Sequence, residues 1–169
     1  MIAALLRDKS LKPKEKTALL CNWLLEGKLA PEALLEFASS AKDPAKATCI
    51  EALEFALQKN DKLVGDAEFR FVTEALTSTA PRVKWESAKV IARVAAHHQS
   101  DLEPAITNLL VNTEHEGTVV RWSAATALGA ILLLKTNHND RLRPALETLR
   151  DREEKDSIRK IYAAALGKV

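Results

Sequence analysis

At 169 residues, the chain is long enough to bury one substantial hydrophobic core, and we expect a single domain over residues 1–169. Apolar residues make up 47% of the sequence and aromatic residues only 5%, a composition that favours packed helices over sheets. The net charge of +2 excludes a uniformly basic or acidic chain, so any electrostatic recognition must come from how the charges are distributed.

Turn residues divide the chain into helical segments. Pro13 suits the first turn of a helix and Gly27 its end, while Ser100 and Glu103 have the spacing of a capping box. We expect helices, in chain order, over about residues 2–7, 13–26, 31–40, 43–59, 66–77, 81–97, 101–112, 118–135 and 139–152, and a last one from residue 156.

One sequence pattern recurs at a nearly constant interval. Its clearest copy is TVVRWSAATALGAI, residues 118–131, in which apolar residues form one face of an amphipathic helix. The equivalent positions Ala45, Val83, Val120 and Ile158 are separated by 38, 37 and 38 residues. Such a period is the signature of stacked supersecondary units, so we expect an all-α solenoid of about five stacked antiparallel helical hairpins.

The best copies share an aliphatic residue, a basic residue and an alanine-rich stretch that ends in Ala-Leu-Gly. They consist of Val120, Arg121, Ala124, Ala125, Ala127, Leu128 and Gly129, and of Ile158, Arg159, Ala163, Leu166 and Gly167. This pattern resembles the HEAT-repeat family, and most closely its phycobilisome-lyase type, from about Pro31 onward. Two earlier copies carry Glu54 and Ala92 where the glycine stands.

The resemblance implies a right-handed α–α superhelix. In each hairpin we call the first helix A and the second, which carries the pattern, B. In HEAT arrays the B helices line the concave face, so the same placement is expected here.

Charge is distributed unevenly between the two kinds of helix. The middle A helices contain the base Arg70 and the acids Glu32, Glu36, Asp66, Glu68, Glu74, Asp101 and Glu103. From the third B helix onward, the acids are Glu86 and Asp156 and the bases are Arg82, Lys84, Lys89, Arg93, Arg121, Lys135, Lys155, Arg159, Lys160 and Lys168. We therefore expect a basic concave face and an acidic convex face.

A basic residue occupies the second position of every copy, as Lys46, Lys84, Arg121 and Arg159. Two interpretations remain open for this column. Its members either form a structural ladder of hydrogen bonds to loop carbonyls and acids of neighbouring repeats, as is common in the family, or belong to a binding surface. Lys89, Arg93 and Lys160 lie outside the column and are better evidence for a surface.

Trp85 and Trp122 occupy equivalent positions, each directly after a basic residue. On a helical wheel Trp122 lies beside the core stripe, at the edge of the concave face. The two indoles either pack between repeats or serve as aromatic anchors for a partner. Trp23, in the irregular first hairpin, is expected in the core.

The motifs of catalysis are absent from the sequence. It has no HExxH, no phosphate-binding loop and no nucleophile motif, and His97 and His98 are expected to cap a helix end. Cys21 and Cys49 are expected as small buried side chains of a reduced protein. Alkylpurine DNA glycosylases share HEAT-like repeats and a basic concave surface, but no carboxylate is expected beside Trp85 or Trp122.

These observations predict a non-enzymatic scaffold, without cofactor or metal, that binds a partner protein with an acidic segment through its basic B-helix face. The alternative is a nucleic-acid-binding module related in architecture to those glycosylases, and the repeat type alone suggests a third, lyase-like or chaperone role. We expect no membrane or small-molecule partner and a cytoplasmic location. The predicted contact residues are Lys84, Trp85, Lys89, Arg121, Trp122, Arg159 and Lys160.

Overall fold

The computed structural model describes residues 1–169 and contains helices but no strand, as expected. The α-helices are α1 (Ile2–Arg7), α2 (Pro13–Leu25), α3 (Pro31–Ser40), α4 (Asp43–Leu57), α5 (Asp66–Ala75), α6 (Pro81–Val94), α7 (Leu102–Asn112), α8 (Thr118–Leu132), α9 (Asn139–Arg152) and α10 (Asp156–Leu166). Two 3-10 turns, Ala95–His97 and Gln99–Asp101, connect α6 to α7.

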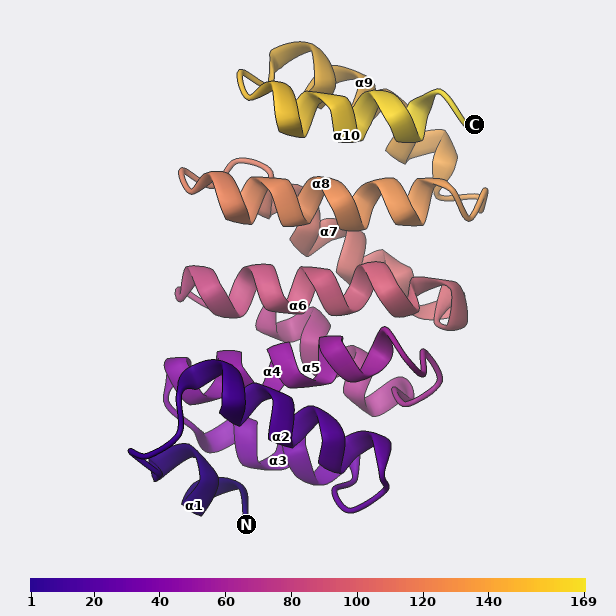
Figure 1. The fold of residues 1–169 in the computed structure, drawn as a ribbon. Coiled ribbons are helices and arrows are strands. Elements are labelled where there is room, and N and C mark those ends of the chain that lie inside the picture. Colours follow the sequence, from indigo (N-terminus) through magenta and orange to yellow (C-terminus); the bar gives the residue numbers. More distant parts are fainter.

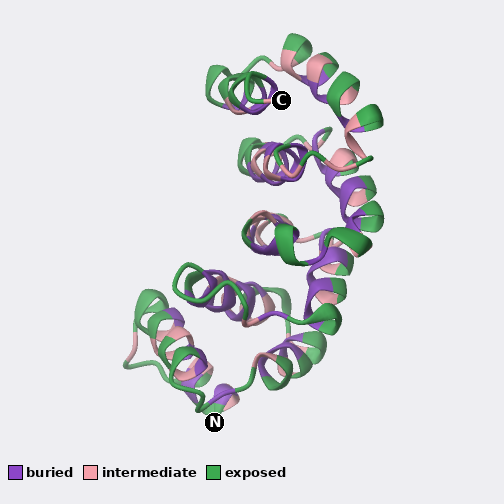
Figure 2. Ribbon diagram, turned by 90° about the vertical axis from the view of Figure 1, so that its right-hand side faces the viewer, coloured by how far each residue is buried: buried purple, intermediate pink, exposed green.

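The helices form the right-handed α-solenoid of stacked hairpins that the repeat predicts (Figure 1). The B helices α2, α4, α6, α8 and α10 pack side by side in one layer, and α3, α5, α7 and α9 form the A layer behind them. The short helix α1 packs on α2 and completes the irregular first hairpin. The stack is curved, and the B helices lie on its inner, concave side (Figure 2).

Local sequence explains where four of the helices begin and where one ends. Proline occupies the first turn of α2, α3, α4 and α6, where a missing N–H costs no helical hydrogen bond. Gly27 has a φ of 70°, a left-handed conformation that suits glycine and ends the α2 hairpin segment.

The junction between α6 and α7 differs from the prediction. The Ser100–Glu103 capping box is not formed, because residues 99–101 make a 3-10 turn and α7 begins at Leu102 without a side-chain cap. His98 is buried, stacks on Phe69 with ring centroids 4.6 Å apart, and contacts the Asp66 carboxylate and the Val64 carbonyl. His98 therefore holds the loop between α4 and α5 in place and does not cap α6.

A continuous cluster of 42 buried hydrophobic residues runs through the stack from Ile2 to Leu166. Where B helices meet, the buried residues are small, including Ala88, Ala125 and Gly129. A Cβ atom on Gly129 would lie only 3.2 Å from the Ala165 Cβ atom of α10. The small side chains of the repeat therefore set the close approach of neighbouring B helices.

This packing predicts different outcomes for one substitution at two equivalent alanines. Ala125→Leu should destabilise the protein by about 1–3 kcal/mol, because a larger side chain overpacks the buried B-layer contact. Ala163→Leu, in the same register but exposed on α10, should change stability by no more than about 0.5 kcal/mol. Urea unfolding measures both, and an equal loss in the two variants would contradict the proposed packing.

Candidate interaction surface

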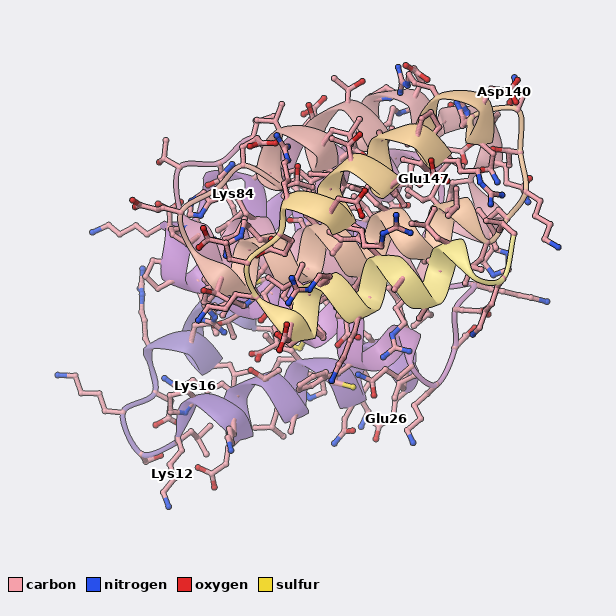
Figure 3. The ribbon with its side chains drawn as sticks, turned by 90° about the horizontal axis from the view of Figure 1, so that it is seen from above. Lys12, Lys16, Glu26, Lys84, Asp140 and Glu147 are labelled. Atoms are coloured by element: carbon pink, nitrogen blue, oxygen red, sulfur yellow. The ribbon has the colours of Figure 1, made fainter.

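Lys84 lies at the edge of the stack where the B helices begin (Figure 3). Its ammonium group donates to the Leu76 carbonyl at 3.0 Å and to the Asn112 Oδ1 atom of α7 at 2.8 Å. Burial lowers the pKa of Lys84 below its ordinary value. Lys84 thus ties the loop of its own hairpin to the next A helix, which is the contact expected of a structural ladder.

Arg121 makes the corresponding contacts one repeat later. Its guanidinium donates to the carbonyls of His115 and Glu116, both at 3.1 Å, and to the two carboxylate oxygens of Glu153 at 3.1 and 3.3 Å. Burial acts to raise the pKa of Glu153, but hydrogen bonds from Arg121 and the Lys155 N–H outweigh it and hold that pKa below its ordinary value. Lys84 and Arg121 therefore have the structural role.

The outer members of the column do not complete the ladder. Lys46 is half-buried and lines a cavity with Glu74, and its ammonium group makes no hydrogen bond to the protein. Arg159 is exposed and pairs with Asp156 on its own helix. Of the four basic residues in the column, Lys84 and Arg121 therefore form the ladder contacts, and Lys46 and Arg159 do not.

On the concave face, the bases of α6 are paired with carboxylates. Glu54 of α4 is buried and accepts from Arg93 Nε at 3.0 Å, and Lys89 Nζ lies 3.8 Å from the same carboxylate. Arg82 pairs with the half-buried Glu51 at 3.0 Å. The expectation of a basic concave face is thus corrected over α4 and α6, because Glu51 and Glu54 of α4 pair with the bases of α6.

Trp85 has a carboxylate beside it, contrary to the sequence prediction. Its indole N–H donates to Glu86 Oε1 at 2.9 Å, while Lys89 donates to Glu86 Oε2 at 3.2 Å. Glu86 is the next residue along α6, where side chains normally point about 100° apart, and the length of both side chains lets the carboxylate reach the indole N–H. Burial raises the pKa of Glu86, and the effects of Lys89 and Trp85 oppose that rise. Both carboxylate oxygens are therefore engaged within the protein.

The exposed side of α8 is apolar. Val119, Trp122 and Leu133 are 50%, 40% and 39% exposed, and Leu133 lies at the C-terminal end of the helix. Between Trp122 and Leu133, only the smaller Thr126 and Ala130 lie on this side. We call these five residues the α8 stripe. Their spacing of three and four residues places them on one side of the helix, whereas Val120, Ala124 and Leu128 face the core.

Cationic side chains lie on both sides of the α8 stripe. On α6, the side chains of Arg82, Lys89 and Arg93 are partly exposed, whereas their carboxylate partners Glu51 and Glu54 are half-buried and buried. On α10, Lys160 is exposed and takes part in none of the ion pairs of the chain. Because α6, α8 and α10 are neighbours in the B layer, the apolar stripe is bordered by positive charge.

The seven predicted contact residues thus lie in three different environments. Trp85, Lys89, Trp122 and Lys160 are on the B helices around the α8 stripe, whereas Lys84 and Arg121 are held in the ladder and Arg159 is paired locally. Sequence reasoning missed Val119 and Leu133. Their spacing of three and eleven residues from Trp122 indicates that they lie on the same side of the helix as Trp122, beside the core positions.

Three further observations, on metal ligands, membrane-spanning helices and cysteines, bear on the kind of site. No group of three or more His, Cys, Asp and Glu side chains is arranged to hold a metal ion. None of the helices is both long and apolar enough to cross a membrane. Cys49 is buried, which raises the pKa of its thiol to about 12, and Cys21 is half-buried.

Comparison with protein families agrees with the sequence repeat. The family model described as HEAT repeats matches residues 69–167. The chain therefore belongs to the HEAT-repeat family. No curated protein matches the sequence.

Solved structures share the fold at low sequence identity. A computationally designed armadillo repeat protein for modular peptide recognition has a TM-score of 0.76 and 18% identity, over 99% of this chain and 80% of that one. Another designed armadillo repeat protein, in complex with the peptide (KR)4, has a TM-score of 0.73 and 18% identity over the same shares. The CpcE–CpcF complex of phycocyanin lyase from Nostoc sp. PCC7120 has a TM-score of 0.74 and 17% identity, over 97% and 94% of the chains.

The ladder predicts a pH-dependent loss of stability. Because the folded state lowers the pKa of Glu153, its ionised form stabilises the fold above the ordinary value of 4.5, and this contribution is lost as the pH falls through the lowered pKa. Glu153→Gln should cost about 1–3 kcal/mol at pH 7 and much less at pH 3. Thermal unfolding over this range measures the difference. Glu154→Gln, an exposed neighbour, is the control, and a pH-independent loss in Glu153→Gln would contradict the ladder.

Proposed function

We propose that this HEAT-repeat chain acts as one non-catalytic module that binds a partner protein through the concave face of its B helices, centred on the α8 stripe. The observation that carries the proposal is the exposure of Val119, Trp122 and Leu133 on one side of α8. A large aromatic and two aliphatic side chains in one exposed row, bordered by charge, have the composition of a protein interface.

The position of the α8 stripe also supports this function. Curved repeat arrays use their concave surfaces for extended contacts with partners, and Trp122 is the residue type most often found at the energetic centre of an interface. Trp85 lies on the neighbouring helix α6 and is half-buried. It extends the aromatic surface next to Trp122, which is consistent with its predicted role as a second contact.

The neighbours of known structure are compatible with a protein partner. One is a designed armadillo protein in complex with (KR)4, a peptide of lysine and arginine, and another is a complex of two lyase subunits. The exposed side chains of α6 and α10 in the present chain are cationic, so a partner with acidic residues would complement them. This preference is opposite in sign to that of the designed armadillo complex.

The same surface gives less support to nucleic-acid binding. A phosphate-binding surface is expected to be continuously positive, whereas Lys89 and Arg93 already pair with Glu54, and apolar side chains occupy α8. The side chains of Lys84 and Arg121 also donate hydrogen bonds to carbonyls and side chains of the protein. A lyase-like or chaperone role rests on the repeat type alone.

Substitution of the α8 stripe tests the proposed function. The variant Val119→Ser/Trp122→Ala should lose at least tenfold in the amount of each specific partner retained from an extract of the source cells, because it removes the main apolar contacts. Quantitative mass spectrometry of proteins captured by the immobilised chain measures this loss. Val111→Ser is the matched control, because Val111 is 65% exposed on the A helix α7.

Retention of the same partners by the double variant would refute the concave-face site, provided that its melting temperature is unchanged. A labelled DNA duplex tests the alternative at about 50 and about 150 mM salt. Micromolar binding that weakens with salt and is lost in Lys89→Glu/Lys160→Glu would favour nucleic acid over a protein partner.

A further inference from the structure

Resting on the proposed function, we infer that the element recognised by this chain is an amphipathic α-helix of the partner, with acidic residues on both sides of its apolar face. In this arrangement the partner helix lies along α8, with its apolar face on the α8 stripe. Its acidic side chains face the cations of α6 on one side and of α10 on the other.

The direction of the exposed apolar residues favours a helix over an extended segment. Val119, Trp122, Thr126 and Leu133 have the three-and-four spacing of a coiled-coil seam, and they follow α8 over about 21 Å at 1.5 Å per residue. An extended segment that crosses the B helices at Trp122 would make one contact with this row and then meet the half-buried Trp85 of α6 on one side and Lys160 of α10 on the other. A helix parallel or antiparallel to α8 covers the whole row.

The sizes of the side chains along α8 are also suited to a helical partner. Large residues occupy the two ends of the α8 stripe, and Thr126 and Ala130 occupy its centre. Small central residues let two helix axes approach to about 8–10 Å, which is the distance at which side chains interdigitate. Val119 and Trp122 at one end and Leu133 at the other would then pack against successive turns of the partner.

The charges beside the α8 stripe specify acidic flanks. The exposed parts of Arg82, Lys89 and Arg93 face the concave side from α6, while the carboxylates of Glu54 and Glu86 are buried beneath them. Lys160 on α10, and Lys168 just beyond its C-terminal end, are exposed and take part in none of the ion pairs of the chain. Acids beside a helical seam pair with bases on the facing helices and set the choice of partner.

Three fluorescently labelled peptides of 18 residues, of the order of five turns each, test this inference. The first is a helix-forming sequence with leucine at the seam positions and glutamate beside them. The second has lysine in place of each glutamate, and the third is the acidic peptide with two central prolines that break the helix. Fluorescence anisotropy with the full chain gives the dissociation constants.

The acidic helical peptide should bind at least tenfold more tightly than either of the others. Trp122→Ala should weaken that binding at least tenfold, and Lys160→Glu should weaken it about threefold to tenfold. The matched controls Val111→Ser and Lys62→Glu, which change exposed residues outside the concave face, should leave it unchanged. Lys160→Glu should also strengthen binding of the lysine peptide.

Equal binding of the proline-containing peptide would overturn the helical partner, and equal or tighter binding of the lysine peptide to the unmodified chain would overturn its acidic character. Absence of binding by the acidic peptide would also reject the inference. A dimer of the chain that is lost in Trp122→Ala would assign the α8 stripe to a second copy. None of these peptide outcomes decides the proposed function itself, since capture of partners by the unmodified chain and the Val119→Ser/Trp122→Ala variant tests that independently.

Discussion

The close approach of successive B helices through small side chains is the contact on which this structure depends. Ala88 and Ala125 are buried in the B layer, and a Cβ atom on Gly129 would lie only 3.2 Å from the Ala165 Cβ atom of the next helix. Close packing of this kind restricts the rotation of each B helix about its own axis, because neighbouring helices can approach this closely only where small residues meet. The residues presented to the concave side follow from that rotation.

The restricted rotation gives each position of the repeat a distinct environment. The second position points toward the edge of the stack, where Lys84 and Arg121 satisfy loop carbonyls and bind the next A helix. The glycine position lies between B helices, and α4 has Glu54 there instead. Its buried carboxylate is stabilised by Lys89 and Arg93 of α6, in keeping with the rule that a buried charge must be paired.

The concave face is therefore divided into two chemically different parts. Over α4 and α6, acids and bases alternate and largely compensate one another, while the large exposed side chains of α8 are apolar. An electrostatic surface for phosphates would need the first part to be unpaired. An apolar seam between two rows of cations instead favours a partner that contributes both hydrophobic and acidic side chains.

The repeat period predicted the helices and their order because the packing contacts recur with it. The capping box at Ser100 was wrong because a 3-10 turn competes for that segment, driven by the burial of His98 against Phe69. The sequence offered both roles for the basic column, and only the distances from Lys84 and Arg121 to their acceptors distinguish them. The pairing of Glu54 across helices depends on a contact 39 residues away along the chain, to Arg93, which no local pattern contains.

The central claim is that a partner polypeptide covers the exposed side of α8, and site-specific photo-crosslinking in the source cells tests it most directly. The photoreactive residue p-benzoylphenylalanine would be placed at Thr126, within the α8 stripe, or at Thr107, exposed on the A helix α7. If a partner covers the exposed side of α8, a crosslinked partner polypeptide is expected from position 126 and none from position 107. Crosslinking from position 107 alone would place the interaction surface on the convex side and contradict binding over α8.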